Sequence, residues 1–329
     1  MAVTIKDVAR LAGVSQSSVC RALADPARVR PETRDRVQSA AKQLGYHPNR
    51  VARSLITGRT ANLGVVLPDL ANPFFPTVVK AIQTRARRFD YAVFLSDTDE
   101  DPAVEVPAIR ALAMQVDGFL LCSPRAPDDD LRPFAREKPM VVLNRRITPL
   151  PSVTADSADG MRQAVAHLAA LGHRTLAYVA GPRTSWSNRD RQRGLRAATT
   201  AHGIRLVEVG NVAPTVDGGA AAADLVLAAT GVTAVLAYND LVALGLLRRC
   251  HARGVRVPEQ LSVVGFDDIL IAGLLAPPLT TVAIGKERIG RVGVDLLLEL
   301  MTDPDHRGTA KRVLPTQLIV RGSTGPAVS

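Results

Sequence analysis

The side chains best suited to binding chemistry in this sequence follow short apolar runs. Asn144, Asn239 and Asp267 each stand directly after a run that is typical of a buried strand. In an open sheet of parallel strands, ligands bind outside the carboxyl ends of the strands, so we expect these three side chains at one ligand site. Amides and carboxylates form paired hydrogen bonds to neighbouring hydroxyls, which is how a polyol such as a sugar is held.

An arginine and two aromatic residues add to this candidate site. Arg191 lies near the start of a predicted helix, and its guanidinium offers a planar fork of hydrogen-bond donors. Phe75 and Trp186 are candidates to stack on the apolar face of a sugar ring. Trp186 fits the hydrophobic core equally well. Asp240 and Asp268 are interpreted as structural, because a polar residue after a strand often caps the following helix.

The sequence lacks the motifs that mark common catalytic and nucleotide-binding sites. No P-loop, GxGxxG, HExxH or GxSxG pattern is present, and the six histidines are scattered. The three cysteines, at positions 20, 122 and 250, form neither a CxxC pair nor a cluster with histidine, which argues against a disulfide framework and a zinc site. We therefore expect no catalytic residues, no metal and no cofactor.

Two short helices joined by a tight turn are predicted at the N-terminus. Thr4 is suited to cap the first helix, and Gly13 is suited to end it in the left-handed conformation. Apolar residues recur between them at helical spacing: Ile5, Val8, Ala9 and Ala12. Ser15 is suited to cap a second helix that runs to Leu23. This arrangement is typical of a helix-turn-helix.

The second helix has a polar face of the kind that reads DNA. Gln16, Ser17 and Arg21 lie opposite the inward-facing Val19 and Leu23. A recognition helix enters the major groove, where Gln pairs with adenine and Arg with guanine. Residues 1–60 hold eleven Lys or Arg against four Asp or Glu, while the whole chain of 329 residues carries a net charge of +10. A basic segment of this kind indicates a polyanion partner.

A third helix and a short hinge are predicted next. The third helix is expected over about Glu32–Leu44, with Gly45 ending it. One or two helical turns then run from Asn49 through Ala52 to Leu55. Helices this short are marginal alone in water, so the segment is suited to order on DNA and to melt when released.

The rest of the chain alternates apolar strands with amphipathic helices. The clearest predicted strands are Leu63–Pro68, Ala92–Ser96, Gly118–Leu121, Met140–Asn144, Leu176–Gly181, Val235–Tyr238 and Leu261–Phe266. This alternation predicts the α/β class, with parallel sheets covered by helices on both faces. No apolar run reaches the length of a membrane span, and the N-terminus has no signal-peptide core, so we expect a cytoplasmic protein without a membrane partner.

Two runs in the first 60 residues are distinctive: TIKDVARLAGVSQSSVCRAL and VRPETRDRVQSAAKQLGYHPNRVARSL. They are followed by the run GRTANLGVVLPDLANPFF. These runs resemble the lac repressor (LacI/GalR) family, and the resemblance extends over nearly the whole chain to the C-terminus. The resemblance implies a helix-turn-helix domain at 1–47, a hinge at 48–60 and a core of two periplasmic-binding-protein-like lobes at 61–329. The first lobe is expected at about 61–157 with 286–312, and the second at about 160–284 with the C-terminal segment.

The resemblance also implies which residues contact DNA. Gln16, Ser17 and Arg21 would read bases. Phosphate contacts would come from Thr4, Ser15, Ser18, Thr33, Tyr46 and Asn49. The hinge, including Ala52 and Leu55, would enter the minor groove, where the leucine pries open a base step. This sequence departs from the family pattern at Cys20, Ala24 and Arg30, which puts the usual set of phosphate contacts in doubt.

The same resemblance implies that Phe75, Asn144, Arg191, Asn239 and Asp267 bind the effector. Trp186 is added because its ring could stack on the apolar face of a sugar. The expected protein is a homodimeric transcription regulator, with repression the favoured outcome, that binds a pseudo-palindromic operator under the allosteric control of a small molecule. A sugar or sugar derivative is the favoured effector, and a nucleoside stays open. The sign of the effector's action stays open as well.

Two other functions fit the sequence less well. A solute-binding protein would need an export signal and no DNA-binding domain, and the first 60 residues oppose both. A sugar-modifying enzyme fused to a DNA-binding domain would need catalytic or nucleotide motifs, which are not found. Turnover of a bound ligand would favour the enzyme.

Overall fold

A computed structural model of the chain describes residues 3–24, 29–46, 59–303 and 310–328. The chain divides into two compact units. The first comprises Met1–Asn62 with Gln115–Asp117, and the second comprises Leu63–Met114 with Gly118–Ser329. Among the described residues, none of the helices has the length and apolar character needed to span a bilayer.

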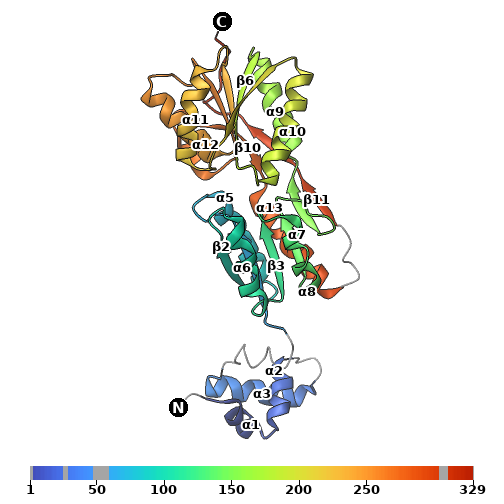
Figure 1. The fold of residues 1–329 in the computed structure, drawn as a ribbon. Helices are drawn as coiled ribbons and strands as arrows, with labels where there is room; N and C mark the ends of the chain where they lie inside the picture. The colour runs from blue at the N-terminus through green and yellow to red at the C-terminus, as the bar shows by residue number, and fades with distance from the viewer. Residues whose placement is uncertain (1–2, 25–28, 47–58, 304–309, 329) are drawn as a thin grey trace. The chain divides into compact units, whose positions relative to one another are not determined.

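The first unit contains three short helices, α1 (Ile5–Ala12), α2 (Gln16–Ala24) and α3 (Pro31–Leu44), drawn in blue in Figure 1. Each helix contributes one fully buried valine, Val8, Val19 and Val37, to a common apolar core. The predicted helix-turn-helix and the helix that follows it are therefore confirmed.

Thr4 and Gly13 mark the two ends of α1. The backbone N–H and the hydroxyl of Thr4 both donate to the Asp7 carboxylate, at 3.0 and 2.7 Å. Gly13 has a φ of +64°, and the next N–H, of Val14, donates to the carbonyl of Ala9. These bonds satisfy backbone groups that a helix end leaves without an intrahelical partner. The sequence itself therefore sets where the turn of the helix-turn-helix begins.

Six strands form the first sheet of the second unit, in the order β11-β5-β4-β3-β1-β2. Neighbours β1 and β3, β3 and β4, β4 and β5, and β5 and β11 pair in parallel. The strands are β1 (Asn62–Leu67), β2 (Ala92–Asp97), β3 (Gly118–Cys122), β4 (Met140–Leu143), β5 (Ser152–Ala155) and β11 (Lys311–Leu314). The helices of this lobe are α5 (Phe74–Arg87), α6 (Pro102–Ala113), α7 (Asp128–Leu131), α8 (Phe134–Glu137) and α13 (Lys286–Thr302).

A second six-stranded sheet has the order β12-β10-β9-β8-β6-β7, with β12 alone antiparallel to its neighbour. Helices α9 (Ser157–Ala170) and α10 (Trp186–Ala201) cover one face, and α11 (Val216–Ala228) and α12 (Asp240–Ala252) cover the other (Figure 1). The strands are β6 (Thr175–Ala180), β7 (Arg205–Asn211), β8 (Ala234–Ala237), β9 (Ser262–Asp267), β10 (Thr280–Ile284) and β12 (Thr316–Ile319). A 3-10 turn, η2 (Leu270–Leu274), follows β9.

The chain passes between the two sheets three times. It leaves β5 of the first sheet for α9, which packs on β12 and β10 of the second. It leaves β10 of the second sheet for α13, which packs on β3, β4 and β5 of the first. The third passage is at Pro315, between β11 and β12. Each sheet with its helices is called a lobe here, and the predicted α/β class with two parallel-sheet lobes is confirmed.

Candidate functional sites

Five of the six predicted ligand residues line one small cavity between the lobes. Phe75 and Asn144 come from the first lobe, and Arg191, Asn239 and Asp267 come from the second. Strands β4, β8 and β9 end next to it, so the cavity lies at the carboxyl ends of both sheets, where ligands of such sheets bind. The positions of these residues after their strands thus bring the side chains together.

Arg191 is the central cation of the cavity and is almost completely buried. Its guanidinium donates to the Tyr238 carbonyl and, at 3.1 Å, to the Asp267 carboxylate. It also lies over the Phe266 ring, 3.7 Å from the ring centroid. Burial raises the pKa of Asp267, and the positive charges of Arg191 and Lys286 oppose that rise. The pair is therefore a preformed group that offers donors and acceptors to a hydroxylated ligand.

Asn239 has two roles at the start of α12. Its Oδ1 accepts from the Val242 N–H at 2.9 Å and caps the helix, and its Nδ2 donates to the Pro214 carbonyl at 3.3 Å. The interpretation of Asp240 as the cap is therefore wrong, because the cap stands one residue earlier. One amide hydrogen of Asn239 remains for a ligand after these bonds.

Asp240 instead lies completely buried behind the cavity. Its carboxylate accepts from the Thr281 hydroxyl at 2.5 Å and from the Ile269 N–H at 2.8 Å. A Cβ at Gly265 would come within 2.1 Å of this carboxylate, so the glycine leaves the room that it needs. Burial, with the nearby charge of Asp267, raises the pKa of Asp240 to about 8. Asp240 therefore holds the turn after β9 in place and is mostly protonated at neutral pH.

Asn144 and Phe75 form the first-lobe side of the cavity. Asn144 has a left-handed backbone, with a φ of +58°, and its Nδ2 donates to the Ser123 hydroxyl at 3.0 Å. Phe75 packs edge-on against Phe74, with ring centroids 5.0 Å apart. The first lobe therefore supplies both a polar group and an aromatic wall.

Trp186 does not line the cavity. It is the first residue of α10, and it lies half-buried next to Arg146, whose guanidinium is 5.8 Å from the indole centroid. Ser187, Asn188 and Arg191 on the same helix are buried, and Arg191 lines the cavity. Trp186 therefore does not join the other five predicted residues in this cavity, and its role as an effector contact stays a prediction.

Asp268, which was interpreted as structural, contacts Arg321 at 2.7 Å.

Seven further residues line the cavity but were not predicted from the sequence: Asn72, Phe74, Glu100, Ser123, Arg125, Pro214 and Tyr238.

Hydrogen bonds join the two lobes beside the cavity. The Ser187 hydroxyl donates to the Asn144 carbonyl at 3.0 Å. The Lys286 ammonium, in the first turn of α13, donates to the carbonyls of Asp267 and Asp268 at 2.5 and 2.7 Å. The enclosed space is about 10 Å³, room for about one water molecule. A ligand of sugar size therefore requires the lobes to separate before it enters.

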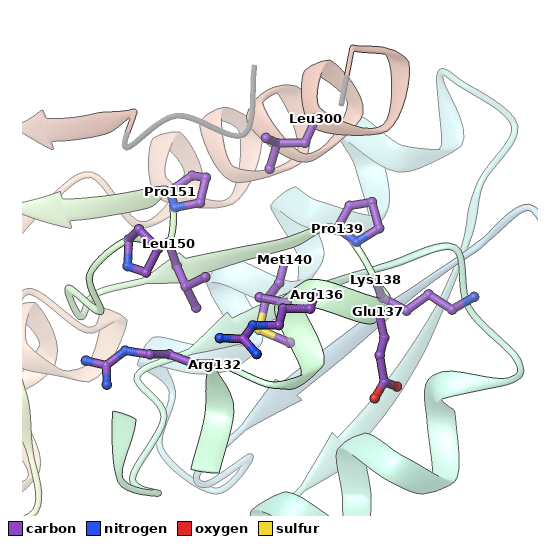
Figure 2. A pocket seen from close by; sticks show the side chains of 11 residues that line it. Arg132, Arg136, Glu137, Lys138, Pro139, Met140, Leu150, Pro151 and Leu300 are labelled. Carbon is purple, nitrogen blue, oxygen red and sulfur yellow. The ribbon is translucent and has the colours of Figure 1, made fainter. Parts of the chain in front are cut away.

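A hollow of about 250 Å³ lies at the opposite edge of the first sheet (Figure 2). Pro139 and Pro151, which line it, directly precede β4 and β5, so it lies at the amino ends of these strands. Figure 2 shows Lys138 and Glu137 extending away from Leu300 on the other wall. Four charged side chains line this hollow, Arg132, Arg136, Glu137 and Lys138. It lies away from the carboxyl ends of the strands, where ligands of such sheets bind, so the cavity at the carboxyl ends is the better candidate.

The predicted base readers form an exposed face on α2. Gln16, Ser17 and Arg21 are all exposed, and the Arg21 Nε donates to the Ser17 carbonyl at 3.3 Å. The opposite side of the helix carries the buried Val19. One face of α2 is thus free for a partner while the other is held in the core.

The predicted phosphate contacts are more varied. The hydroxyls of Ser15 and Ser18 lie 2.9 Å apart, and Ser15 caps α2 through the Ser18 N–H at 3.1 Å. Thr4 is exposed, and Thr33 is half-buried. Tyr46 packs against the apolar core of the three helices, and burial raises its pKa. The predicted contacts Asn49, Ala52 and Leu55 lie outside the described residues.

Two departures from the family pattern have visible consequences. Arg30 precedes α3 without forming a side-chain cap, so that helix begins on Pro31 alone. Cys20 is half-buried on α2 and contributes to the raised pKa of Tyr46. Within the part of the chain that the structure describes, no group of three or more His, Cys, Asp or Glu residues is placed to hold a metal ion.

Comparison with known proteins gives two family matches. Residues 4–49 match the bacterial regulatory proteins of the lacI family, and residues 165–324 match a periplasmic binding protein-like domain. The chain is 34% identical to the HTH-type transcriptional repressor CytR of Escherichia coli (strain K12), over 98% of this chain and 96% of that protein.

Two solved structures have a similar fold over nearly the whole chain. The lac repressor dimer bound to operator and the anti-inducer ONPF is 31% identical, with a TM-score of 0.86 over 99% of this chain and 100% of that one. The complex of the transcriptional regulator CelR with cellobiose is 32% identical, with a TM-score of 0.73 over 98% of this chain and 100% of that one.

Proposed function

Because the chain belongs to the lacI family of bacterial regulatory proteins, we propose that it represses transcription as a homodimer on a pseudo-palindromic operator, and that a sugar bound between its lobes controls this repression. That the chain is a DNA-binding transcription regulator follows from its family. We propose in addition that it represses transcription, that its DNA target is pseudo-palindromic and that its effector is a sugar. We also propose that the protein acts in the cytoplasm and that it is not an enzyme.

The observation that carries the proposal is the cavity between the lobes. Arg191, paired with Asp267, and the amides of Asn144 and Asn239 converge there with the aromatic wall of Phe75. Paired donors and acceptors beside an aromatic ring suit the hydroxyls and the apolar face of a sugar. The CelR relative is a complex with cellobiose, which supports a carbohydrate effector here.

The exposed face of α2 is the proposed base reader. Gln16, Ser17 and Arg21 would read base edges, and the hydroxyls near the helix ends would position the domain on phosphates. The hinge segment at 48–60 would contribute Asn49, Ala52 and Leu55 in the minor groove. Separation or closure of the lobes would bias the pairing of two hinges in the dimer, which couples the effector to DNA.

The experiment uses the full-length protein and a duplex selected from random DNA by the protein itself. Ligands are screened by thermal shift, because a ligand that binds the folded state raises its melting temperature. The panel contains D-ribose, D-glucose, cellobiose and cytidine. Any ligand found is then added to the protein–DNA complex to measure the change in DNA affinity.

Asn239→Ala tests whether the cavity is the effector site. We expect this variant to lose the ligand response and to keep the ligand-free affinity for DNA. The variant also loses a helix cap, which costs about 1 kcal/mol. Thr215→Ala is the matched control, because Thr215 caps α11 through the Gly218 N–H at 3.1 Å without lining the cavity. A normal response in Asn239→Ala would place the effector site elsewhere.

A further inference from the structure

The first-lobe wall of the cavity carries an ion pair that mirrors Arg191 and Asp267 across from it. The Arg125 guanidinium donates from Nε and Nη2 to the two oxygens of the Glu100 carboxylate, at 2.6 and 2.9 Å. The Arg125 side chain is only 3% exposed. Both residues line the cavity. Each lobe therefore presents one buried arginine that is held by one acid.

The loop that carries Arg125 is fixed by a second group of buried charges. The Glu105 carboxylate accepts from the N–H groups of Arg125 and Ala126, at 2.6 and 3.2 Å. The Arg145 guanidinium donates to the carbonyls of Pro124 and Ala126, at 2.7 and 2.8 Å. Buried charges are costly unless they are paired and hydrogen-bonded. Glu105 and Arg145 both bind the short loop that carries Arg125. We infer that they fix the position of the Arg125 guanidinium at the cavity.

Both arginines keep N–H donors that are not used by any group in the described part of the chain. A guanidinium has five N–H groups. Arg125 uses three of them, two on Glu100 and one on the Ser123 carbonyl at 2.9 Å. On the opposite wall, the buried Nε of Arg191 has no hydrogen-bond partner among the residues that the structure describes. Two guanidiniums with unused donors therefore face the same cavity from opposite lobes.

The charges that line the cavity are balanced. Arg125 and Arg191 carry two positive charges, and Glu100 and Asp267 carry two negative ones. The remaining lining residues are polar but uncharged, or apolar. A phosphate or carboxylate on the ligand would have to be desolvated in a site where each guanidinium already has its counter-ion. Hydroxyls can instead take the unused donors without disturbing either pair.

We propose that Arg125 and Glu100 form a second gripping pair for the effector and that they restrict it to uncharged polyols. This inference rests on the proposed function, since it concerns the ligand of the same cavity. It adds that Arg125 and Glu100 make the site prefer a neutral sugar over the phosphate or acid of that sugar.

The test compares each neutral compound with its charged counterpart in the full-length protein. The pairs are D-ribose with ribose 5-phosphate, D-glucose with glucose 6-phosphate and D-glucose with gluconate, and cellobiose is added as a larger neutral sugar. Dissociation constants are measured by calorimetry. We expect a neutral member to bind at least about tenfold more tightly than its charged counterpart, a difference of ~1.4 kcal/mol. Tighter binding of a charged member, or binding of no neutral member, overturns the proposal.

Glu100→Gln tests the residue assignment. This change leaves Arg125 without its counter-ion, and the amide can still accept one of its hydrogen bonds. We expect the ratio of neutral to charged affinity to fall about tenfold or more, because the cavity then carries one net positive charge. Glu137→Gln removes an exposed acid of the same lobe and serves as the control. An unchanged ratio in Glu100→Gln overturns the role of the pair.

The charge-conserving variant Arg125→Lys provides a second test that does not depend on how well Glu100→Gln folds. It keeps the positive charge and loses the planar fork, so we expect weaker binding of the neutral sugar with little change in melting temperature. Unchanged binding of the neutral sugar by Arg125→Lys overturns the gripping role. If Asn239→Ala abolishes binding while Glu100→Gln changes no preference, the cavity stands as the effector site and only this inference fails.

Discussion

The hydroxyl of Ser187 donates a hydrogen bond of 3.0 Å to the carbonyl of Asn144, although the two residues belong to different lobes. Asn144 presents that carbonyl because its backbone is left-handed. Ser187 is the second residue of α10, the helix that also carries Arg191 into the cavity. The bond therefore ties the start of this helix to the end of β4 and helps to keep the lobes closed.

Ser187→Ala is expected to shift the lobes toward an open arrangement. Loss of one hydrogen bond is worth about 1 kcal/mol, which changes the closed-to-open ratio about fivefold. Trp186, the only tryptophan of the chain, adjoins Ser187 and contacts Arg146 of the other lobe. Its fluorescence should therefore shift to longer wavelength in the variant, because opening exposes the indole.

Thr302→Ala is the control for this measurement. Its hydroxyl donates to the Leu298 carbonyl of its own helix, and it is the last residue of α13, far from the cavity. We expect the Trp186 emission of this variant to match that of the unmodified protein. An emission maximum that stays in place in Ser187→Ala would mean that the bond does not hold the lobes.

Lys286→Met is expected to destabilise the second unit. The Lys286 ammonium is buried and bonds to the carbonyls of Asp267 and Asp268, both of which have positive φ. Hydrogen bonds to a charged group contribute about 1.5–3 kcal/mol each, so we expect the loss of both to lower the free energy of unfolding by ~3 kcal/mol or more. Denaturant unfolding measures this loss. The exposed Lys311→Met should change it by less than about 0.5 kcal/mol, and equal effects of the two changes would remove the special role of Lys286.

Much of the cavity could be predicted because its residues stand at strand ends. Asn144, Asn239 and Asp267 each lie at the last residue of a strand or within two residues after it, and a strand end is readable from an apolar run. Arg191 lies near the start of a helix and faces the same edge. The α/β class followed from the alternation of runs in the same way, since each run must be covered on both faces.

Arg125 and Glu100 could not be predicted in this way. Each stands three residues beyond its strand, β3 and β2 respectively, in a turn with left-handed residues. Ser123 has a φ of +47° and Glu100 a φ of +60°, values that non-glycine residues adopt uncommonly. The direction of a side chain after such a turn depends on tertiary bonds, here those of Glu105 and Arg145.

Asp240 makes the stability of the protein depend on pH. Its pKa is about 8 in the folded state, against 3.8 for an unperturbed carboxyl, because it is buried near Asp267. Between these values the unfolded chain has lost the proton and the folded chain holds it, so the free energy of unfolding falls as the pH rises from about 4 to 8. We expect Asp240→Asn to flatten this fall, by up to ~1.4 kcal/mol per pH unit.

The slope with pH, not the absolute stability, is the quantity to compare, because an asparagine loses one of the two bonds that Asp240 accepts. Asp224→Asn is the control. Hydrogen bonds from Arg249 and Arg253 lower the pKa of Asp224 to about 2, so this group is ionised in both states between pH 5 and 8 and adds no slope there. Equal slopes in the unmodified protein and in Asp240→Asn would mean that Asp240 stays ionised when folded.

Arg21→Ala is expected to reduce sequence specificity more than general DNA affinity. Arg21 is exposed on the face of α2 that carries Gln16 and Ser17, where a guanidinium can reach a guanine in the major groove. A paired contact of this kind gives about 1–3 kcal/mol of discrimination, so the selected operator should lose about tenfold or more in affinity relative to random DNA. The exposed Arg36→Ala on α3 removes the same charge and should weaken both DNAs alike, because the attraction to phosphates carries no sequence information. Anisotropy titrations at one fixed salt concentration measure both affinities. A proportional loss on both DNAs in Arg21→Ala would make Arg21 a phosphate contact and would leave base reading to Gln16 and Ser17.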